Sequence, residues 1–287
     1  MSPTKLETTT ETNTKGYDLG TRGSHNISKG GKHPYQIPKF DNKKDERKYI
    51  LQHMAAAFRV FARKGYTEGT AGHISVRDPI DTNTFWINPL GKHFGLIKVS
   101  DLVHVDEDGN VLGDGNQTAI NAAGFAIHSA IHKARPDVNA ACHTHSTYGK
   151  AWSSMGKLLD MINQDVCTFY KKHSIFTDFG GVALEEEEGQ KIAAALGDNK
   201  GIILQNHGLL TVGSTVDEAA YLFTLLEKSC QVQLSAQQAL LPGEKLKIIG
   251  DTEASYCEYK EGDPETLFTE FQPDLEMELY LNDDFLN

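Results

Sequence analysis

Long apolar runs are missing from this 287-residue sequence. A helix that crosses a membrane needs about 20 consecutive, mainly apolar residues, and no stretch comes near that length. The sequence also does not open with a charged segment followed by an apolar one, which is the pattern of a secretory signal. We therefore expect neither an integral membrane protein nor a secreted protein.

An excess of basic residues is missing too. The chain has 28 Lys and Arg against 39 Asp and Glu, which gives a formal net charge of −11. Proteins that bind nucleic acids need a basic patch or stripe to neutralise phosphates, and none is visible in the sequence. We therefore expect no nucleic-acid partner and no membrane partner.

Cysteine is scarce, with only Cys142, Cys167, Cys230 and Cys257. They form no Cys-x-x-Cys pair, and four are too few for a disulfide scaffold in a chain of this length. This usage fits a reducing, cytoplasmic location. No internal repeat is visible either, so the pattern is not that of a repeat array.

The acidic charge is concentrated at the C-terminal end. Residues 251–287 contain twelve Asp and Glu and one Lys, whereas residues 1–250 contain 27 acidic and 27 basic residues. Such a stretch is most often a solvated segment, and it also occurs as an interface arm or as a cover over a site. Apolar residues interrupt it, which indicates that it can dock onto the rest of the chain: Leu267, Phe268, Phe271, Leu275 and Leu279.

The distribution of apolar residues divides the chain into three regions. Residues 1–40 have no periodic apolar pattern and are rich in Thr, Ser, Gly and Lys, so we predict a disordered N-terminal arm. Residues 41–240 alternate helical and extended patterns, which predicts one α/β layered domain. Residues 241–287 form the acidic C-terminal extension.

Within the domain, apolar residues at helical spacing alternate with short extended runs. We predict helices from Asp41 to Gly65, over about 119–134 and over about 216–240. Thr215 and Glu218 have the spacing of a capping box at the start of the last of these helices. Short strands are predicted at 74–76, 85–87, 102–105, 111–112, 138–143, 202–204 and 209–212.

Three histidines lie at predicted strand ends. His143 and His145 are two residues apart, so in an extended chain their rings point to the same side. His207 follows another apolar strand, and Gly208 beside it lets a backbone approach closely. If the two strands are neighbours, three neutral imidazoles can hold a divalent transition metal and leave coordination positions open, which is typical of a catalytic site. A His-x-His pair without a third ligand is more often an ordinary polar strand end.

Two further features of this region have simpler interpretations. His128 and His132 are four residues apart on one helix face, but no third ligand accompanies them, so they are weaker metal candidates. Cys142 alternates to the opposite strand face from the histidines, and we expect it in the core.

Four segments together resemble the class II aldolase and adducin family. They follow one another in the family's order across about residues 45–240. In this sequence they read Thr70-Ala71-Gly72-His73-Ile74-Ser75-Val76-Arg77, Ile87-Asn88-Pro89-Leu90-Gly91, Arg135-Pro136-Asp137 with the later His143-Thr144-His145, and Gln205-Asn206-His207-Gly208-Leu209. The combination of Arg-Pro-Asp, His-x-His and His-Gly is specific to the family.

The resemblance implies a fold, a cofactor and an assembly. The implied fold is a three-layer α/β/α sandwich with a central, largely antiparallel sheet. The implied cofactor is a divalent ion on His143, His145 and His207, with Zn²⁺ first and Fe²⁺ as an alternative, because imidazole suits both. The implied assembly is a cyclic homo-oligomer, often a tetramer, with its sites near subunit interfaces and a small molecule as substrate.

The sequence departs from the family in one pocket. The aldolases have a Glu, and the related epimerases an Asp, eleven residues before the arginine of Arg-Pro-Asp; Gly124 stands there in this chain. Ala122 and Ala123 replace the small hydroxyl residues that hold a substrate phosphate, and His73 replaces the Asn of the glycine-rich phosphate loop. The usual proton-transfer residue is therefore missing, and recognition of a phosphorylated sugar is not expected.

Retained metal ligands beside a lost carboxylate favour chemistry that needs no base. Loss of CO₂ from a carboxylate β to a carbonyl or ortho to a phenol needs only a Lewis acid for the developing oxyanion. A proton donor is required afterwards, and Asp165 and Tyr170 are our candidate catalytic residues. The candidate substrate-binding residues are His73, Arg77, Asn88, Gly91 and Gly124, of which Arg77 can form a fork with a substrate carboxylate.

Three functional hypotheses follow from these residues. The first is a metal-dependent carbon–carbon lyase that acts as a decarboxylase or retro-aldolase on a non-phosphorylated substrate. The second is a non-haem Fe(II) oxygenase that uses the same three histidines. The third is a non-catalytic, adducin-like interaction module of the actin cytoskeleton, which the acidic rather than basic tail disfavours.

Overall fold

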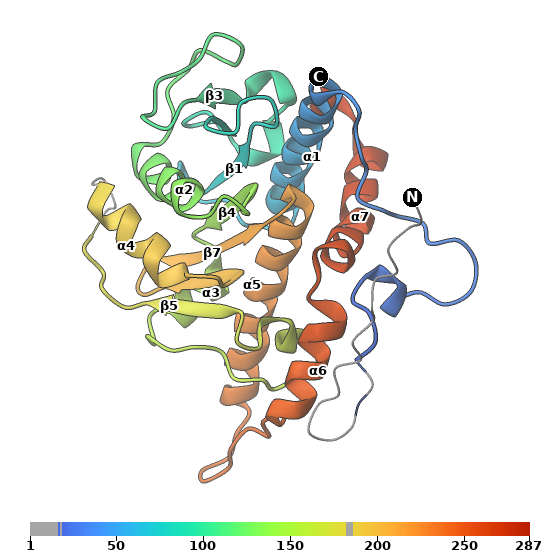
Figure 1. Cartoon of the computed structure of the whole chain (residues 1–287). Coiled ribbons are helices and arrows are strands. Elements are labelled where there is room, and N and C mark those ends of the chain that lie inside the picture. The colour runs from blue at the N-terminus through green and yellow to red at the C-terminus, as the bar shows by residue number, and fades with distance from the viewer. Residues whose placement is uncertain (1–16, 18, 182–185) are drawn as a thin grey trace.

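The structure, a computed structural model, describes residue 17 and residues 19–181 and 186–287. In this part of the chain one sheet runs through the molecule, and it has seven strands in the order β3-β2-β1-β4-β7-β6-β5 (Figure 1). All neighbouring strands are antiparallel except β5 and β6, which are parallel. The strands are β1 His73–Arg77, β2 Phe85–Ile87, β3 Val103–Val105, β4 Ala140–Thr144, β5 His173–Phe176, β6 Gly201–Leu204 and β7 Gly208–Gly213.

Helices cover both faces of the sheet. On one face lie α2 (Ala122–Ala134) and α4 (Glu186–Leu196), and on the other lie α1 (Lys43–Arg63) and α5 (Val216–Gln238), with α3 (Thr147–Ser153) beside α5 (Figure 1). Five short 3₁₀ helices complete this part of the fold: η1 Ser24–Asn26, η2 Phe94–Leu96, η3 Val99–Asp101, η4 Asp165–Phe169 and η5 Asp284–Leu286. The predicted three-layer sandwich with a largely antiparallel sheet is confirmed.

The strand β4 explains how the layers are held together. All five of its residues are buried, because it lies in the middle of the sheet and faces a helical layer on each side. Ala140 and Cys142 belong to the core under α1 and α5, and Ala141 belongs to the smaller core under α2 and α4. The expected place of Cys142 in the core is confirmed, and His143 falls on the face of α2.

Local caps fix where the long helices begin. The side chain of Asn42 accepts from the backbone N–H of Lys44 at the start of α1, and Asn121 accepts from Gly124 at the start of α2. At the start of α5, Thr215 accepts from the backbone of Glu218, as its spacing predicted. Such side chains satisfy N–H groups that have no partner within the helix.

The acidic extension folds into two helices, α6 (Asp251–Glu261) and α7 (Pro264–Leu281). The side chains of Leu267, Phe271 and Phe285 are buried and join the core that contains α1 and α5. Of the apolar residues predicted to dock, Leu267, Phe268, Phe271 and Leu275 are buried, whereas Leu279 is exposed.

The described part of the N-terminal arm lies against this extension. Arg22 forms an ion pair of 2.9 Å with Glu258, and the hydroxyl of Tyr35 donates to Glu276 at 2.6 Å. The sequence predicted disorder for residues 1–40, yet Arg22, Ser24 and Tyr35 contact carboxylates of the acidic helices. The remainder of that prediction lies outside the described residues.

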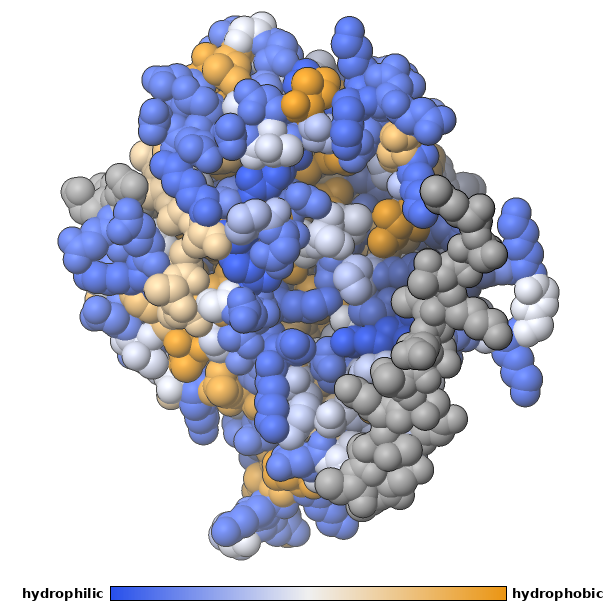
Figure 2. Space-filling view, in the orientation of Figure 1, coloured by the Kyte–Doolittle hydropathy of each residue, from blue (hydrophilic) through white to orange (hydrophobic). Residues whose placement is uncertain are grey.

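The surface in the orientation of Figure 1 is mainly hydrophilic, and apolar residues gather in a band over α2 and α4 (Figure 2). Alanines line the groove between these two helices, among them Ala126, Ala130 and Ala193. No helix in the described part of the chain is both long enough and apolar enough to cross a membrane.

Candidate metal centre

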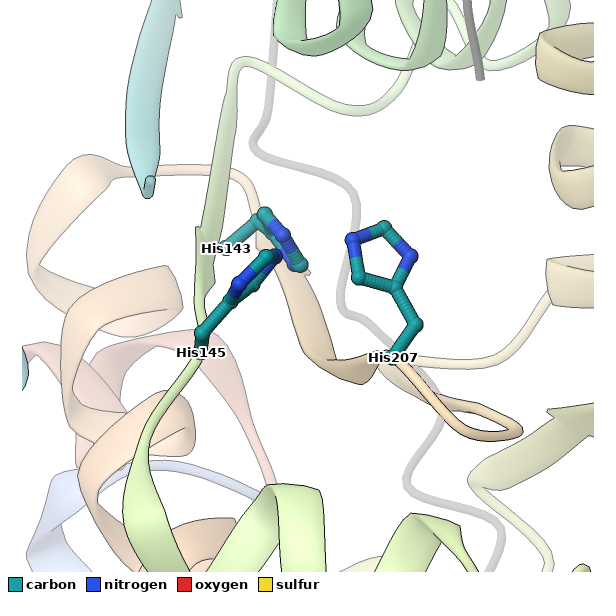
Figure 3. A group of neighbouring side chains, drawn as sticks. All are labelled: His143, His145 and His207. Atoms are coloured by element: carbon teal, nitrogen blue, oxygen red, sulfur yellow. The ribbon is translucent and has the colours of Figure 1, made fainter. Parts of the chain in front are cut away.

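The three predicted histidines meet at one end of the sheet. His143 lies on β4, His145 follows the end of the same strand, and His207 lies in the tight turn between β6 and β7 (Figure 3). One ring nitrogen from each lies within 4.8 Å of the others. The pairing of β4 with β7 brings the two segments side by side, because His143 is opposite Leu210.

The turn that carries His207 depends on its neighbours. Asn206 has a φ of 58°, a left-handed conformation that Asn adopts more readily than most residues. A Cβ at Gly208 would lie 2.8 Å from the carbonyl oxygen of Thr144, so only glycine lets the turn approach β4 this closely.

The donor set fits a divalent transition metal. The Nδ1 of His143 donates to the carbonyl oxygen of Leu209 at 2.8 Å, which leaves its Nε2 free as a metal ligand. A hydrogen bond of this kind to the second ring nitrogen is the usual way that proteins orient a ligating histidine. Three imidazoles with no fourth protein ligand among the described residues leave coordination positions open for a substrate.

The electrostatics of the cluster keep the rings neutral. Burial lowers the pKa of His143 well below its usual value and, with the nearby His145, lowers the pKa of His207 to about 4. Burial also lowers the pKa of His145, and Lys150 acts in the same direction while Glu68 opposes it. Neutral imidazole is the form that binds a metal, so the site is ready for an ion at neutral pH.

A cavity of about 360 Å³ opens beside the three rings. Its walls are formed by small residues, by the apolar side chains of Ile127 and Phe179, and by Lys150, which is the single charged side chain among the described lining residues. The further lining residues are Thr70, Ala71, His73, Asn121, Ala123, Gly124, Gly181 and Asn206. This volume suits a small organic molecule.

Two of the predicted substrate-binding residues, His73 and Gly124, line this cavity. His73 is the β1 partner of His143, and their rings are stacked with centroids 5.6 Å apart. Gly124 in α2 packs directly on the His73 ring. Burial, followed by the influence of His145 and His207, lowers the pKa of His73 to about 3.

The three other predicted substrate-binding residues lie outside the cavity lining. Arg77 is at the far end of β1 from His73 and donates to the carbonyls of His132, Arg135 and Val138, so it caps the end of α2 instead of facing a substrate. Asn88 bridges the backbone of Gly72 and Ile74, which supports the start of β1.

Gly91 occupies an open turn with a φ of 82°, where its role is conformational. An L-residue with a side chain is strained in this region of φ, which explains a glycine there without any ligand.

The predicted catalytic residues Asp165 and Tyr170 also lie outside the lining of the cavity beside the three histidines. The chain changes faces between His145 and α3, which lies beside α5, and Tyr170 in the segment that follows packs against the core of α1 and α5. Asp165 is exposed in a depression beside Tyr221 and Glu270. Proximity in sequence to His143 and His145 does not place a residue near them once the chain has changed faces.

The weaker histidine pair has a structural partner. The hydroxyl of Ser75 lies 2.6 Å from Nδ1 of His128 and 2.8 Å from Nε2 of His132, and all three side chains are buried between β1 and α2. This hydrogen-bonded group accounts for the spacing of the two histidines without a metal.

Three residues of the centre were not found from the sequence. Lys150 and Phe179 line the cavity, and Glu227 of α5 lies beneath the turn that follows His145. Glu227 is 78 to 81 residues away in the sequence from its hydrogen-bond donors, so no local sequence pattern indicates its role.

Comparison with known proteins identifies the family. Residues 52–234 match the profile described as "Class II Aldolase and Adducin N-terminal domain", which is more than half of the chain. The chain belongs to the class II aldolase and adducin family. With this fold and a complete histidine triad it is an enzyme of the lyase type.

Three curated relatives show how similar the members are. The "Meiotically up-regulated gene 14 protein" of Schizosaccharomyces pombe is 52% identical over 83% of this chain and 91% of its own length. "Decarboxylase NovR" of Streptomyces niveus is 45% identical over 73% of this chain and 77% of its own. The "4-hydroxy-3-prenylphenylpyruvate oxygenase/4-hydroxy-3-prenylbenzoate synthase" of Streptomyces roseochromogenus subsp. oscitans is 42% identical over 78% and 82%.

A solved structure supports the same fold. "L-fuculose 1-phosphate aldolase from Glaciozyma antarctica PI12" superimposes with a TM-score of 0.80 at 42% identity. The match covers 87% of this chain and 96% of that chain.

Proposed function

We propose that the protein is a divalent-metal-dependent carbon–carbon lyase that decarboxylates a non-phosphorylated carboxylic acid, with retro-aldol cleavage of such a substrate as the related reaction. The observation that carries the proposal is a complete histidine triad in a cavity whose described lining residues include no carboxylate. Retro-aldol cleavage needs a group that takes a hydroxyl proton, whereas decarboxylation needs no base. The carbon that loses CO₂ takes one proton, for which we propose solvent water as the source because Asp165 and Tyr170 lie outside the cavity lining.

Different residues of the cavity would bind the metal and contact the substrate. His143, His145 and His207 hold the ion, for which we propose zinc, and the hydrogen bond from His143 to Leu209 fixes the ring orientation. A bound divalent ion supplies a Lewis acid for the oxyanion that develops as CO₂ leaves. Ile127 and Phe179 provide apolar walls for the carbon frame of the substrate. An ion on the three neutral imidazoles would carry the positive charge that attracts an anionic substrate.

Decarboxylation is supported by a relative, and a sugar phosphate is disfavoured by the cavity. NovR is named as a decarboxylase, and its sequence is 45% identical to this chain. The solved aldolase is named for a sugar phosphate, but here the single described cation in the lining, Lys150, is already paired with Glu68. A phosphate dianion is usually held by several donors, and the small residues Ala123 and Gly124 offer no side-chain donor.

The test combines metal content with turnover. Elemental analysis of protein purified without chelator under nitrogen should find about one zinc per chain. Release of CO₂ should be detected from members of a panel of aromatic and β-keto acids, and L-fuculose 1-phosphate should not be cleaved. H143A should lose both metal and turnover; retention of both by H143A would show that the proposal is wrong.

A second candidate, an Fe(II) oxygenase on the same triad, is favoured by the relative whose printed name includes "oxygenase". Near-stoichiometric iron, together with oxygen consumption that depends on the substrate, would favour this candidate over the zinc lyase. Turnover that is unchanged under strict anaerobic conditions would exclude it.

The proposal also covers the cellular location and the oligomeric state of the enzyme. We place it in the cytoplasm, where thiols stay reduced, because Cys142, Cys167 and Cys230 are buried as free thiols. We propose a homo-oligomer, as the family often forms, and light scattering on the purified protein measures its size.

A further inference from the structure

His73 is a buried side chain whose ring nitrogens are poorly satisfied. Only 5% of its surface is exposed, and although the side chain of Asn121 is near enough to influence the ring, neither ring nitrogen makes a hydrogen bond of acceptable geometry. Almost all buried polar groups in folded proteins have a partner, so an exception needs an explanation. His73 lines the cavity of the metal centre beside His143 and Asn121, and a ligand in that cavity can supply the well-aligned hydrogen bond that the ring lacks.

Gly124 is shaped to the ring of His73. A Cβ at position 124 would come within 2.5 Å of Cγ, Cδ2 and Nε2 of that ring. Gly124 lies in the first turn of α2 and is not among the glycines with a positive φ, so the backbone does not require glycine. Alanine is the better helix former, and its absence therefore reflects the space that the ring occupies.

The charges around the cavity indicate what His73 meets. The histidine triad accommodates a cation, Lys150 is paired with Glu68 at the edge of the cavity, and no acidic side chain is present among the described lining residues. An anionic oxygen is the ligand atom that such surroundings favour. The apolar side chains of Ile127 and Phe179 in the cavity lining suit the carbon frame of an aromatic acid.

We propose that His73 and Gly124 form a substrate-recognition pair, in which the imidazole donates an N–H to the carboxylate of an aromatic acid and Gly124 leaves the space that the ring needs. The inference rests on the proposed function and names its substrate class. Imidazole has at least one N–H in either protonation state, so the hydrogen bond does not depend on the charge of the ring.

A double-mutant cycle tests the packing of the pair without any assay of activity. G124A should lower the melting temperature, because the new methyl group meets the ring of His73. In the H73A background the same G124A change should raise the melting temperature, because the space is now open and Ala favours the helix. G113A is the matched control, since nothing lies within 4 Å of a Cβ at that position. Equal shifts of G124A in both backgrounds would overturn the pairing.

Ligand binding tests the recognition of a carboxylate. Calorimetry on the zinc-loaded protein compares 4-hydroxybenzoate with 4-hydroxybenzyl alcohol, which lacks the carboxylate. H73A should weaken binding of the acid by about tenfold or more and leave binding of the alcohol unchanged. H73Q, which keeps an N–H donor, should recover part of the loss, and H93A at an exposed turn serves as the control.

Zinc content, measured for each variant, separates this inference from the proposed function. H73A should retain the zinc of the wild-type protein. Equal losses for acid and alcohol, or no saturable binding of 4-hydroxybenzoate to the wild-type protein, would overturn the recognition of a carboxylate while the metal lyase stands. If the wild-type protein contained no zinc, the proposed lyase function would be wrong instead. The double-mutant cycle of melting temperatures would still show whether His73 and Gly124 pack as a pair.

Discussion

Glu227 lies beneath the turn that follows His145 and accepts three hydrogen bonds from it. The donors are the hydroxyl of Ser146 at 2.6 Å, the backbone N–H of Tyr148 at 2.9 Å and that of Gly149 at 2.6 Å. Only 3% of the Glu227 surface is exposed, so water cannot replace these bonds. The carboxylate therefore fixes the backbone that positions one of the three candidate ligands.

We expect E227Q to loosen the metal centre. The amide NH₂ of Gln would face N–H donors, so at least one buried donor would lose its acceptor, at a cost of about 1–3 kcal/mol in the free energy of unfolding. Zinc affinity should fall by about 10- to 100-fold, as for other groups that orient metal ligands. Competition with a chromogenic chelator measures it. E187Q, at an exposed residue paired with Lys191, is the control, and zinc affinity equal to the wild type in E227Q would contradict this role.

Of the site residues, those that belong to a local sequence pattern could be predicted. His143 and His145 were found from their spacing on a strand, and His207 from its place after the next buried run. Glu227 and Lys150 were missed because the contacts that matter join distant segments. Arg77 was misplaced for the same kind of reason: it shares a strand with His73, and the length of that strand separates the two side chains.

The contact between α2 and β1 contains titratable groups that remain neutral in the folded chain. Burial, followed by the nearby Arg77, lowers the pKa of His132 to about 3, and burial lowers the pKa of His128 well below its usual value. Above pH 6.5 both histidines are neutral in the folded and the unfolded chain. As the pH falls below 6.5 the unfolded chain binds protons and the folded chain does not, so stability is lost.

This linkage predicts an acid-labile element. One unit of pKa shift corresponds to about 1.4 kcal/mol, so between pH 6.5 and pH 5 His132 should cost about 2 kcal/mol of unfolding free energy. H132Q removes the titrating ring and should reduce the loss over this interval by that amount. Urea unfolding of both proteins at several pH values measures the difference. A wild-type protein and an H132Q variant that lose stability in parallel would contradict the linkage.

Elements with a strong period were predictable and elements without one were not. The helices around residues 41–65, 119–134 and 216–240 appear as α1, α2 and α5, with ends that differ by a few residues. The strand β5 was missed because only two of its four residues are buried, so it has little apolar signal. The predicted second strand at 111–112 is reduced to a single bridge between Val105 and Val111, beside the turn at Gly109.

The whole molecule is larger than the domain that the family pattern outlines. Residues 241–287 were predicted as an acidic extension that can dock, and Phe271 and Phe285 show that its helices complete the core of α1 and α5. The charge pattern alone indicates a solvated segment. The apolar spacing along α7 carries the information about docking, because a helix buries one face and exposes the other to water.

The fold as a whole predicts how the protein responds to removal of its metal. His143 is held by the pairing of β4 with β1 and β7 and by its bond to Leu209, and His207 is held by the turn between β6 and β7. None of these contacts involves an ion, and the sheet has helical layers on both faces. The cluster is therefore built in advance, in contrast to small domains that fold only around zinc.

Chelation should leave the sheet intact and lower the melting temperature. Zinc binds the folded chain and has few organised ligands in the unfolded one, so added zinc should stabilise the protein by about 2.7 kcal/mol at a free concentration of 100 Kd. Far-UV circular dichroism of protein dialysed against EDTA, followed by thermal melts over a zinc titration, measures both effects. The rise in melting temperature should disappear in H207A, because two histidines from β4 and its end bind zinc far more weakly than three. Loss of the far-UV signal on chelation would show that the ion organises the sheet, and a zinc-independent melting temperature in the wild-type protein would show that the three rings do not bind zinc.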